Sequence, residues 1–348
     1  MTEVREPETA TTSEPSLSFE KRSRRVAAVA FVRGAALLPV IGVLLIIGAA
    51  ASPVFFTVSN LAGVGQQASA LGMVVIGESL IIMIGGMDLS LESTFGLAPM
   101  VSAWLMVPLA AFGAGTLWGW VPGILVLLGV GAVVGLINGF AIVKFRLNGF
   151  IWTLAMTIIL YGVMTGITNG QSLPDEPAEW SYLGSAYWGQ IPVSLVFTVL
   201  VFVGVGLFLR YHRWGRDIYA VGGNRAAARA AGIRVDRIRI GVYVAGSVLA
   251  AIGGLMEAGR DLSVASTQGY EEGIIFNVFA ASVIGGVSLK GGRGGMLGAG
   301  LGVILLALVQ NVLDLGQVNN YWIDAIDGAV ILFALIMARV IGGEAAAD

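Results

Sequence analysis

Long apolar runs recur along the whole chain and restrict its fold more than any other feature. A helix needs about 20 apolar residues to cross roughly 30 Å of hydrocarbon. Such runs occupy residues 34–51, 60–84, 91–107, 120–143, 150–169, 192–210, 238–257, 273–289, 294–313 and 321–340. The runs 60–84 and 273–289 contain enough Gly and polar residues to be broken or re-entrant. The sequence predicts an all-α polytopic membrane protein with about ten transmembrane helices, some of them broken or re-entrant.

The composition agrees with a lipid environment. Hydrophobic residues make up 56% of the chain and charged residues 12%, about half the charged share of a soluble domain. The 50 glycines fit membrane helices, where small residues let backbones approach closely. The alternative is a large soluble α/β core rich in Gly and Ala, but such cores are not built from repeated membrane-length runs. The chain has no Cys, which excludes disulfides and thiol chemistry.

The distribution of charge predicts the orientation, because cytoplasmic loops of membrane proteins are rich in Lys and Arg. With the N-terminus inside and one crossing per run, every Lys and Arg except Arg260 falls on the cytoplasmic side. The opposite loops collect Asp175, Glu176, Glu179, Asp261, Glu271, Glu272 and Asp314. We therefore expect both termini in the cytoplasm.

Three regions follow from this pattern. Residues 1–25 form a polar tail that we expect to be disordered, 26–341 form the membrane domain, and 342–348 form a short cytoplasmic tail. A signal peptide is an alternative for the N-terminus, since KRSRR precedes an apolar run that ends in AAAS. Its cleavage would leave nine spans and invert the charge bias.

One extended polar segment, residues 210–237, separates two of the runs and is expected to be cytoplasmic. Asn224 can cap a short helix over 225–231, and Gly232 can end it. That helix is basic on one side and Ala-rich on the other. It could lie on anionic lipid headgroups, but the flanking glycines favour a compact helix that docks on a protein partner.

An aspartate, Asp88, follows the pair Gly85-Gly86 between two apolar runs. A charge at the centre of a membrane helix costs about 3 kcal/mol or more. Asp88 is tolerated if the glycines end one helix and Asp88 or Ser90 caps the next. The same break could line a solute path with free backbone groups, and the two interpretations are compatible.

Several uncharged hydrogen-bonding side chains also lie at membrane depth. Each alone could simply hold two helices together. Together with aromatic faces they suit a neutral, hydroxylated solute. The candidate substrate-pathway residues are Gln66, Gln67, Glu78, Asp88, Ser90, Asn138, Phe150, Trp152, Asn277 and Asn311.

The sequence carries no motif for chemistry of its own. GxxxxGK[ST], HExxH, G-x-S-x-G and Cys/His clusters are absent, and GGRGGMLGAG lacks the Lys-Ser/Thr of a phosphate loop. The single histidine, His212, lies in the basic segment, where a solvated side chain is expected. We expect no catalytic residue, metal or cofactor, and any ATP must be bound by another subunit.

Five stretches resemble one transporter family. GGNRAAARAAGIRVDRIR is similar to the coupling motif of ABC-importer permeases, specifically those of the ribose/xylose/galactose type. IGGMDLSLES, GLINGFAIVKFRLNGFIWTLAMTIILYGVMTGITNGQSLP, GGVSLKGGRGGMLGAGLG and VQNVLDLGQVNNYWIDAIDGAVILFAL resemble further patterns of that family, in order, over about residues 40 to 340. Glu92 replaces a usual Gly, and Asn148-Gly149 replaces a proline-rich pair, which puts the usual sugar preference in question.

The resemblance implies the membrane subunit of an ATP-driven importer in the bacterial cytoplasmic membrane, moving a small polar solute, most simply a monosaccharide. It implies a second permease subunit, a cytoplasmic ATPase and an extracytoplasmic binding protein as partners, and no nucleic acid. The residues matched to ATPase coupling are Gly222, Asn224, Ala227, Ala228, Gly232 and Ile233.

Alternatives remain open within and beyond this class. Nucleoside and branched-chain amino-acid importers share the architecture. A secondary transporter would use Glu78 and Glu257 as proton or sodium sites, and a membrane scaffold would only recruit a partner through its basic segment.

Overall fold

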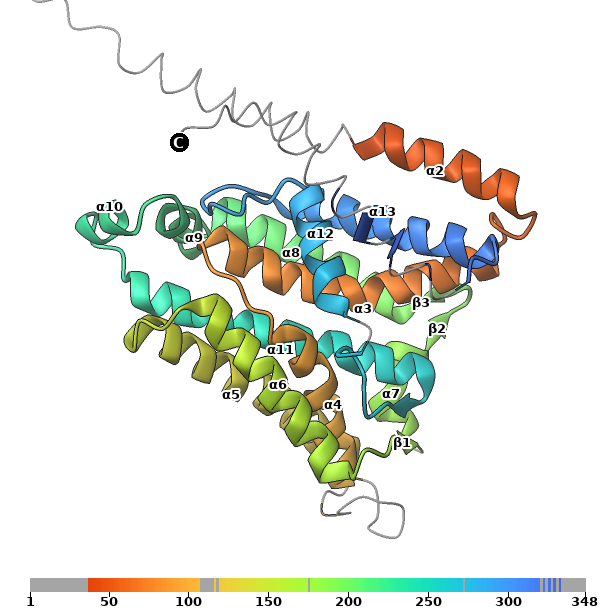
Figure 1. Cartoon of the computed structure of the whole chain (residues 1–348), viewed down its shortest axis with the longest axis horizontal. Coiled ribbons are helices and arrows are strands. Elements are labelled where there is room, and N and C mark those ends of the chain that lie inside the picture. The colour runs from red at the N-terminus through yellow and green to blue at the C-terminus, as the bar shows by residue number, and fades with distance from the viewer. Residues whose placement is uncertain are drawn as a thin grey trace, which may run out of the picture.

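The computed structural model describes residues 37–106, 116, 119–174, 176–271 and 273–319, with six single positions between 322 and 332. The helices are α2 (Leu37–Ala51), α3 (Val58–Met83), α4 (Leu91–Met106), α5 (Trp120–Lys144), α6 (Gly149–Thr168), α7 (Ala178–Ser185), α8 (Val193–Tyr211), α9 (Arg213–Gly223), α10 (Arg225–Ala230), α11 (Val235–Asp261), α12 (Ile274–Ile284) and α13 (Met296–Leu315) (Figure 1). Four strands of two residues each, β1 (Leu173–Pro174), β2 (Tyr187–Trp188), β3 (Ile191–Pro192) and β4 (Ser263–Val264), form two small antiparallel pairs. The prediction of an all-helical membrane fold is confirmed apart from these pairs.

Six of the described helices are long and apolar enough to cross a membrane: α3, α5, α6, α8, α11 and α13. α2, α4 and α12 are shorter, with 15, 16 and 11 residues. The predicted span 321–340 and the two predicted tails lie outside the described residues, apart from single positions. The predicted count of about ten helices is therefore not confirmed. The expectation of a break inside 60–84 is wrong because α3 is continuous, whereas 273–289 contains only the short α12.

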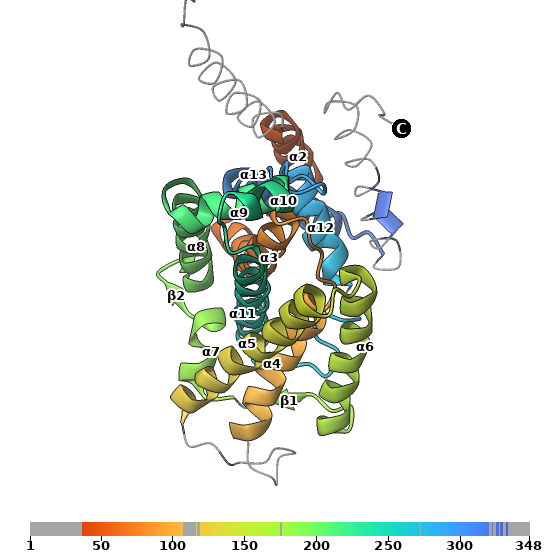
Figure 2. The ribbon, with the colours of Figure 1, turned by 90° about the vertical axis from the view of Figure 1, so that its left-hand side faces the viewer.

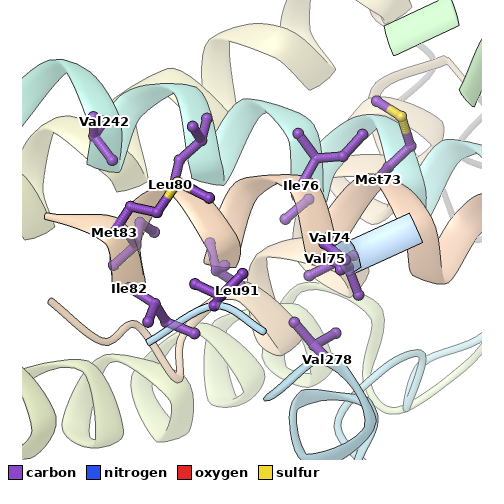
Figure 3. Packing of buried hydrophobic residues seen from close by; sticks show 14 of the residues in the cluster. Met73, Val74, Val75, Ile76, Leu80, Ile82, Met83, Leu91, Val242 and Val278 are labelled. Carbon is purple, nitrogen blue, oxygen red and sulfur yellow. The ribbon is translucent and has the colours of Figure 1, made fainter. Parts of the chain in front are cut away.

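The core lies around α3, which packs against α11, α13, α8 and α12 (Figures 1 and 3). Met73, Ile76 and Ile82 of α3 are fully buried, as is Leu91 at the start of α4. Figure 3 shows these side chains packed with Val242 of α11 and Val278 of α12. The C-terminal half of α3 is therefore surrounded by protein, whereas Val58 and Leu61 near its start are exposed.

Glycines at intervals of four residues bring α5 against α11. Gly131, Gly135 and Gly139 face the α11 backbone, and a Cβ atom at Gly135 would lie 2.6 Å from the Tyr243 carbonyl oxygen. Close approach through small residues is a common way for membrane helices to associate, since lipid supplies no hydrophobic drive between them. This stripe fixes Asn138 of α5 beside Tyr243 of α11.

The loops predicted to be cytoplasmic gather at one end of the molecule, and those predicted to be extracytoplasmic gather at the other. At one end, β1 after α6 pairs with β4 after α11, joining two loops predicted to be extracytoplasmic. At the other end, Lys144 contacts Asp236, and α9 lies against α3 and α8. We call this second end, which carries α9, α10 and the Lys144–Asp236 pair, the basic end, and Figure 2 looks onto it.

Candidate functional site

The chain breaks sharply between α3 and α4. Gly85, with φ of +69°, follows the helix, and its amide donates to Ile82 O while the amide of Gly86 donates to Ile81 O. These two hydrogen bonds form the Schellman arrangement, which satisfies the last carbonyls of a helix. Residues 84–90, which we call the break segment, then lead into α4. The predicted helix end at Gly85-Gly86 is confirmed.

Asp88 lies at the centre of a buried polar network. Its Oδ1 accepts from the Ser90 amide at 3.0 Å and from the Ser90 hydroxyl at 2.6 Å. The Asn138 side chain donates from Nδ2 to Asp88 Oδ2 at 3.1 Å and to Ser90 Oγ at 2.7 Å. All three side chains are fully buried. Ser90 is the residue before α4, so Asp88 orders the approach to this helix. Neither the Asp88 nor the Ser90 side chain accepts from an amide inside α4 in the described part of the chain, so the expected capping role is not confirmed.

The network continues into α6. Trp152 Nε1 donates to Asn138 Oδ1 at 3.0 Å, and the Leu89 amide donates to Thr153 Oγ1 at 3.1 Å. Asn138 therefore bridges Asp88 of the break segment and Trp152 of α6. Hydrogen bonds thus join three segments that are distant in sequence. These bonds lie inside the protein, where the low dielectric constant strengthens them.

Buried polar atoms of α3 and α11 lack a hydrogen-bond partner in the described part of the chain. Glu78 Oε1 accepts from the Asp88 amide at 3.4 Å, whereas Glu78 Oε2 has no hydrogen-bond partner in the described part of the chain. The hydroxyls of Tyr243 and Ser247 on α11 are likewise buried without a partner there. Buried polar groups are rarely left unpaired unless water, a ligand or strain explains them. The Glu78 carboxylate can accept a hydrogen bond from a polar ligand, and the Tyr243 and Ser247 hydroxyls can donate one to it.

The structure gathers half of the predicted pathway residues and separates the rest. Glu78, Asp88, Ser90, Asn138 and Trp152 form the network just described. Gln66 instead binds Gly184 O and Tyr187 Oη toward the opposite end, and Asn311 exchanges two hydrogen bonds with Asn60. Gln67 and Phe150 are exposed, and Asn277 is half-buried on α12.

Thr153 and Tyr243 belong to the site but were not among the predicted residues. Thr153 directly follows Trp152, and Tyr243 has a phenol within an apolar span, a residue type that usually finds a polar partner when buried. That signal could have identified Tyr243.

The predicted polar loop at the basic end is two helices. α10 begins after Asn224, whose Oδ1 accepts from the amides of Ala226 and Ala227 at 2.9 and 3.0 Å. Gly232 follows with φ of +81°. The predicted cap, helix and terminating glycine are confirmed, whereas α9 was not predicted.

Glycines join α9 to the end of α3. The Gly292 amide donates to Met83 O at 2.8 Å, and a Cβ atom at Gly222 would lie 1.8 Å from that same oxygen. Gly291, with φ of +81°, lies against Gly85 in the same way. We call Gly85, Gly222, Gly291 and Gly292 the glycine junction. It puts α9, the break segment and the loop before α13 in backbone contact.

The predicted coupling residues thus divide into two groups. Gly222 lies in the junction, and Ala228 is 4% exposed and packs against its own chain. Asn224, Ala227 and Gly232 are exposed, and Ile233 is half-buried. A partner at this end would meet the second group.

Six described helices of membrane-spanning length, with a buried polar network at a helix break, are the features of a multi-pass membrane protein. Residues 60–335 match the family described as the branched-chain amino acid transport system/permease component, and the chain belongs to that family. The family resemblance is thereby confirmed, and the prediction of a helical membrane protein agrees with it, whereas the predicted count of about ten helices is not confirmed.

Relatives match over most of their length. The ribose import permease protein RbsC of Escherichia coli K12 is 33% identical over 300 residues, 85% of this chain and 90% of the relative. The L-arabinose transport system permease protein AraH of the same strain is 34% identical over 311 residues, 87% and 89% of the two chains. The probable ABC transporter permease protein y4mJ of Sinorhizobium fredii is 34% identical over 281 residues, 80% and 81%. No solved structure matches the chain.

Proposed function

We propose that this chain is the membrane subunit of an ATP-driven importer that moves a monosaccharide across the bacterial cytoplasmic membrane. The observation that carries the proposal is the similarity to ribose and arabinose permeases over more than four fifths of the chain. An extracytoplasmic binding protein would deliver the sugar. A pair of ATPase domains would drive transport at the basic end, which we propose to be cytoplasmic together with both termini.

The site is chemically suited to a sugar. Sugar hydroxyls both donate and accept, and the Asp88 network offers carboxylate, amide, hydroxyl and indole groups within a few ångströms. The unpaired Glu78 Oε2 and Tyr243 Oη supply a further acceptor and a further donor. We propose that the network lies on the solute path and that a second permease subunit completes the path.

Uptake into proteoliposomes tests this function. The chain would be reconstituted with its partner ATPase and binding protein, with ATP inside and labelled ribose, arabinose or xylose outside. We expect uptake that requires both ATP and the binding protein. Uptake driven by a proton or sodium gradient alone would support a secondary transporter instead, and no flux under any condition would support a scaffold.

The family description gives one specific reason to keep a second candidate. Because the family is described by branched-chain amino acid transport, leucine and a nucleoside should be offered in the same assay. A secondary transporter has less support, since the proposed ion ligand Glu257 is held by Arg260.

A further inference from the structure

We propose that Arg225 is the positioning residue through which α10 moves the break segment, and with it the Asp88 network. This inference rests on the proposed function and names the connection by which ATPase movement would reach the solute path. Arg225 is not among the predicted coupling residues, which were matched by motif alone.

Arg225 binds the end of α3 from another helix. It is the first residue of α10, and its Nη2 donates to Gly85 O at 2.8 Å and to Ile84 O at 3.3 Å. Both carbonyls lie directly after the last turn of α3, next to the end where the helix dipole presents partial negative charge. A guanidinium satisfies such carbonyls with charge-assisted hydrogen bonds, which are about twice as strong as neutral ones. Arg225 of α10 therefore caps the C-terminal end of another helix, α3.

The capped carbonyls begin the break segment. Gly85 lies three residues before Asp88, whose carboxylate is tied to Asn138 and so to Trp152. The glycine junction lies on the other side of Gly85 and is made of backbone atoms. A displacement of α10 is thus applied at the first residues of a segment that is hydrogen-bonded along most of its length.

A second connection leaves α10 but ends elsewhere. Arg229 contacts Asp236 at 3.3 Å, and Asp236 contacts Lys144 at 2.9 Å. These three side chains are 68%, 39% and 46% exposed, and Arg225 is exposed as well, so water competes for both connections. The Arg229–Asp236–Lys144 contacts differ from those of Arg225 in where they lead. They reach the ends of α11 and α5 and make no contact with the break segment in the described part of the chain.

The test separates movement from folding. The reconstituted complex would carry Arg225→Ala, Arg225→Lys or the control Arg216→Ala. Arg216 is also a basic residue of the α9–α10 segment, but it donates to Tyr211 O at the end of α8, away from the break segment. Uptake and ATP hydrolysis would both be measured, together with the yield of intact complex on gel filtration.

We expect Arg225→Ala to assemble and to hydrolyse ATP while moving about tenfold less sugar per ATP, the effect of losing charge-assisted hydrogen bonds. Arg225→Lys should recover part of the loss, since an ammonium can still donate to Gly85 O. Arg216→Ala should match the wild type. An Arg225→Ala complex with wild-type sugar moved per ATP would overturn the inference while leaving the proposed function intact.

A thiol probe reports on the break segment directly. The chain has no Cys, so Met87→Cys, at a half-buried position of that segment, is uniquely labelled by maleimide. We expect ATP to change its labelling rate in the otherwise wild-type complex and not in the Arg225→Ala complex. An equal response to ATP in both would contradict the inference even if Arg225→Ala lowered transport. A wild-type complex without ATP-dependent uptake would instead refute the proposed function.

Discussion

Asn138 and Asp88 are 50 residues apart in sequence, yet the Asn138 amide donates to Asp88 Oδ2 over 3.1 Å inside the helix bundle. The same Asn138 accepts from Trp152 Nε1, so one amide side chain uses both its donor and its acceptor to join the break segment to α6. Replacement of either end of this bridge has a predictable cost.

Asp88→Asn should be milder than Asp88→Leu. An asparagine can still accept from the Ser90 amide, although it offers one acceptor fewer to Asn138. A leucine removes the acceptor of the Ser90 amide and of the Ser90 hydroxyl, and one of the acceptors of Asn138 Nδ2. Each buried donor left unpaired costs about 1–3 kcal/mol. Thermal unfolding in detergent should rank the stabilities as wild type, Asn, then Leu, and transport should follow the same order. Equal loss with both variants would mean that the charge of Asp88, rather than its acceptor atoms, is what matters.

Gly135→Ala should destabilise the bundle, because its Cβ would lie 2.6 Å from the Tyr243 carbonyl oxygen. Overpacking of this kind costs about 1–3 kcal/mol. Gly129→Ala on the same helix is the matched control, since nothing lies within 4 Å of its Cβ position. The melting temperature in detergent should fall only for Gly135→Ala. A similar fall for both would show that the α5–α11 contact is looser than the structure indicates.

Ala227→Asp should impair ATPase docking without unfolding the protein. Ala227 is exposed at the basic end, so the new carboxylate stays in water. Ala228→Asp is a poor probe of docking, because Ala228 is 4% exposed and its replacement would bury a charge. Co-purification with the ATPase should be weaker for Ala227→Asp at an unchanged melting temperature. Unaltered co-purification would place the docking surface elsewhere.

Gly232→Val should alter the exit from α10. Its φ of +81° is in the left-handed region, which costs a side chain about 1–2 kcal/mol. Since no atom lies within 4 Å of its Cβ position, the strain is local and the fold should persist. Sugar moved per ATP should fall for Gly232→Val and much less for Gly232→Asn, because Asn tolerates this conformation. An equal fall for both would indicate a contact with the ATPase rather than backbone strain.

Lys144→Ala should change little. The Lys144–Asp236 pair is exposed, and exposed pairs contribute about 0–1 kcal/mol. The melting temperature should shift by no more than a degree or two, and added salt should not enlarge the shift. A large destabilisation would indicate that lipid headgroups shield this pair from water.

The sequence was sufficient where a local rule decides the structure. Membrane-length apolar runs located the long helices, Gly85 marked the end of α3, and Asn224 and Gly232 bounded α10. These outcomes depend on residues close together in the chain. Helix lengths were less predictable. Residues 273–289 form an apolar run of membrane length, but α12 within it is only 11 residues long. Hydropathy also does not reveal whether protein or lipid surrounds a run.

The composition of the site depended on tertiary packing. Gln66 and Asn138 look alike in sequence, yet one binds the α7 end and the other Asp88, because neighbouring helices decide which side of each residue is enclosed. The role of Arg225 was hidden for the same reason: its partners, Ile84 O and Gly85 O, lie about 140 residues away. Backbone acceptors leave no trace in side-chain motifs.

The glycine junction makes the contact between α9 and the break segment independent of the side chains on the surface of α10. Its contacts are made by main-chain atoms at Gly85, Gly222, Gly291 and Gly292, so they do not depend on the side chains on the outer surface of α10. If an ATPase docks at the basic end as proposed, those side chains can change without altering the junction. One membrane subunit design can then be recruited by different energy-supplying partners without rebuilding its route for the cargo.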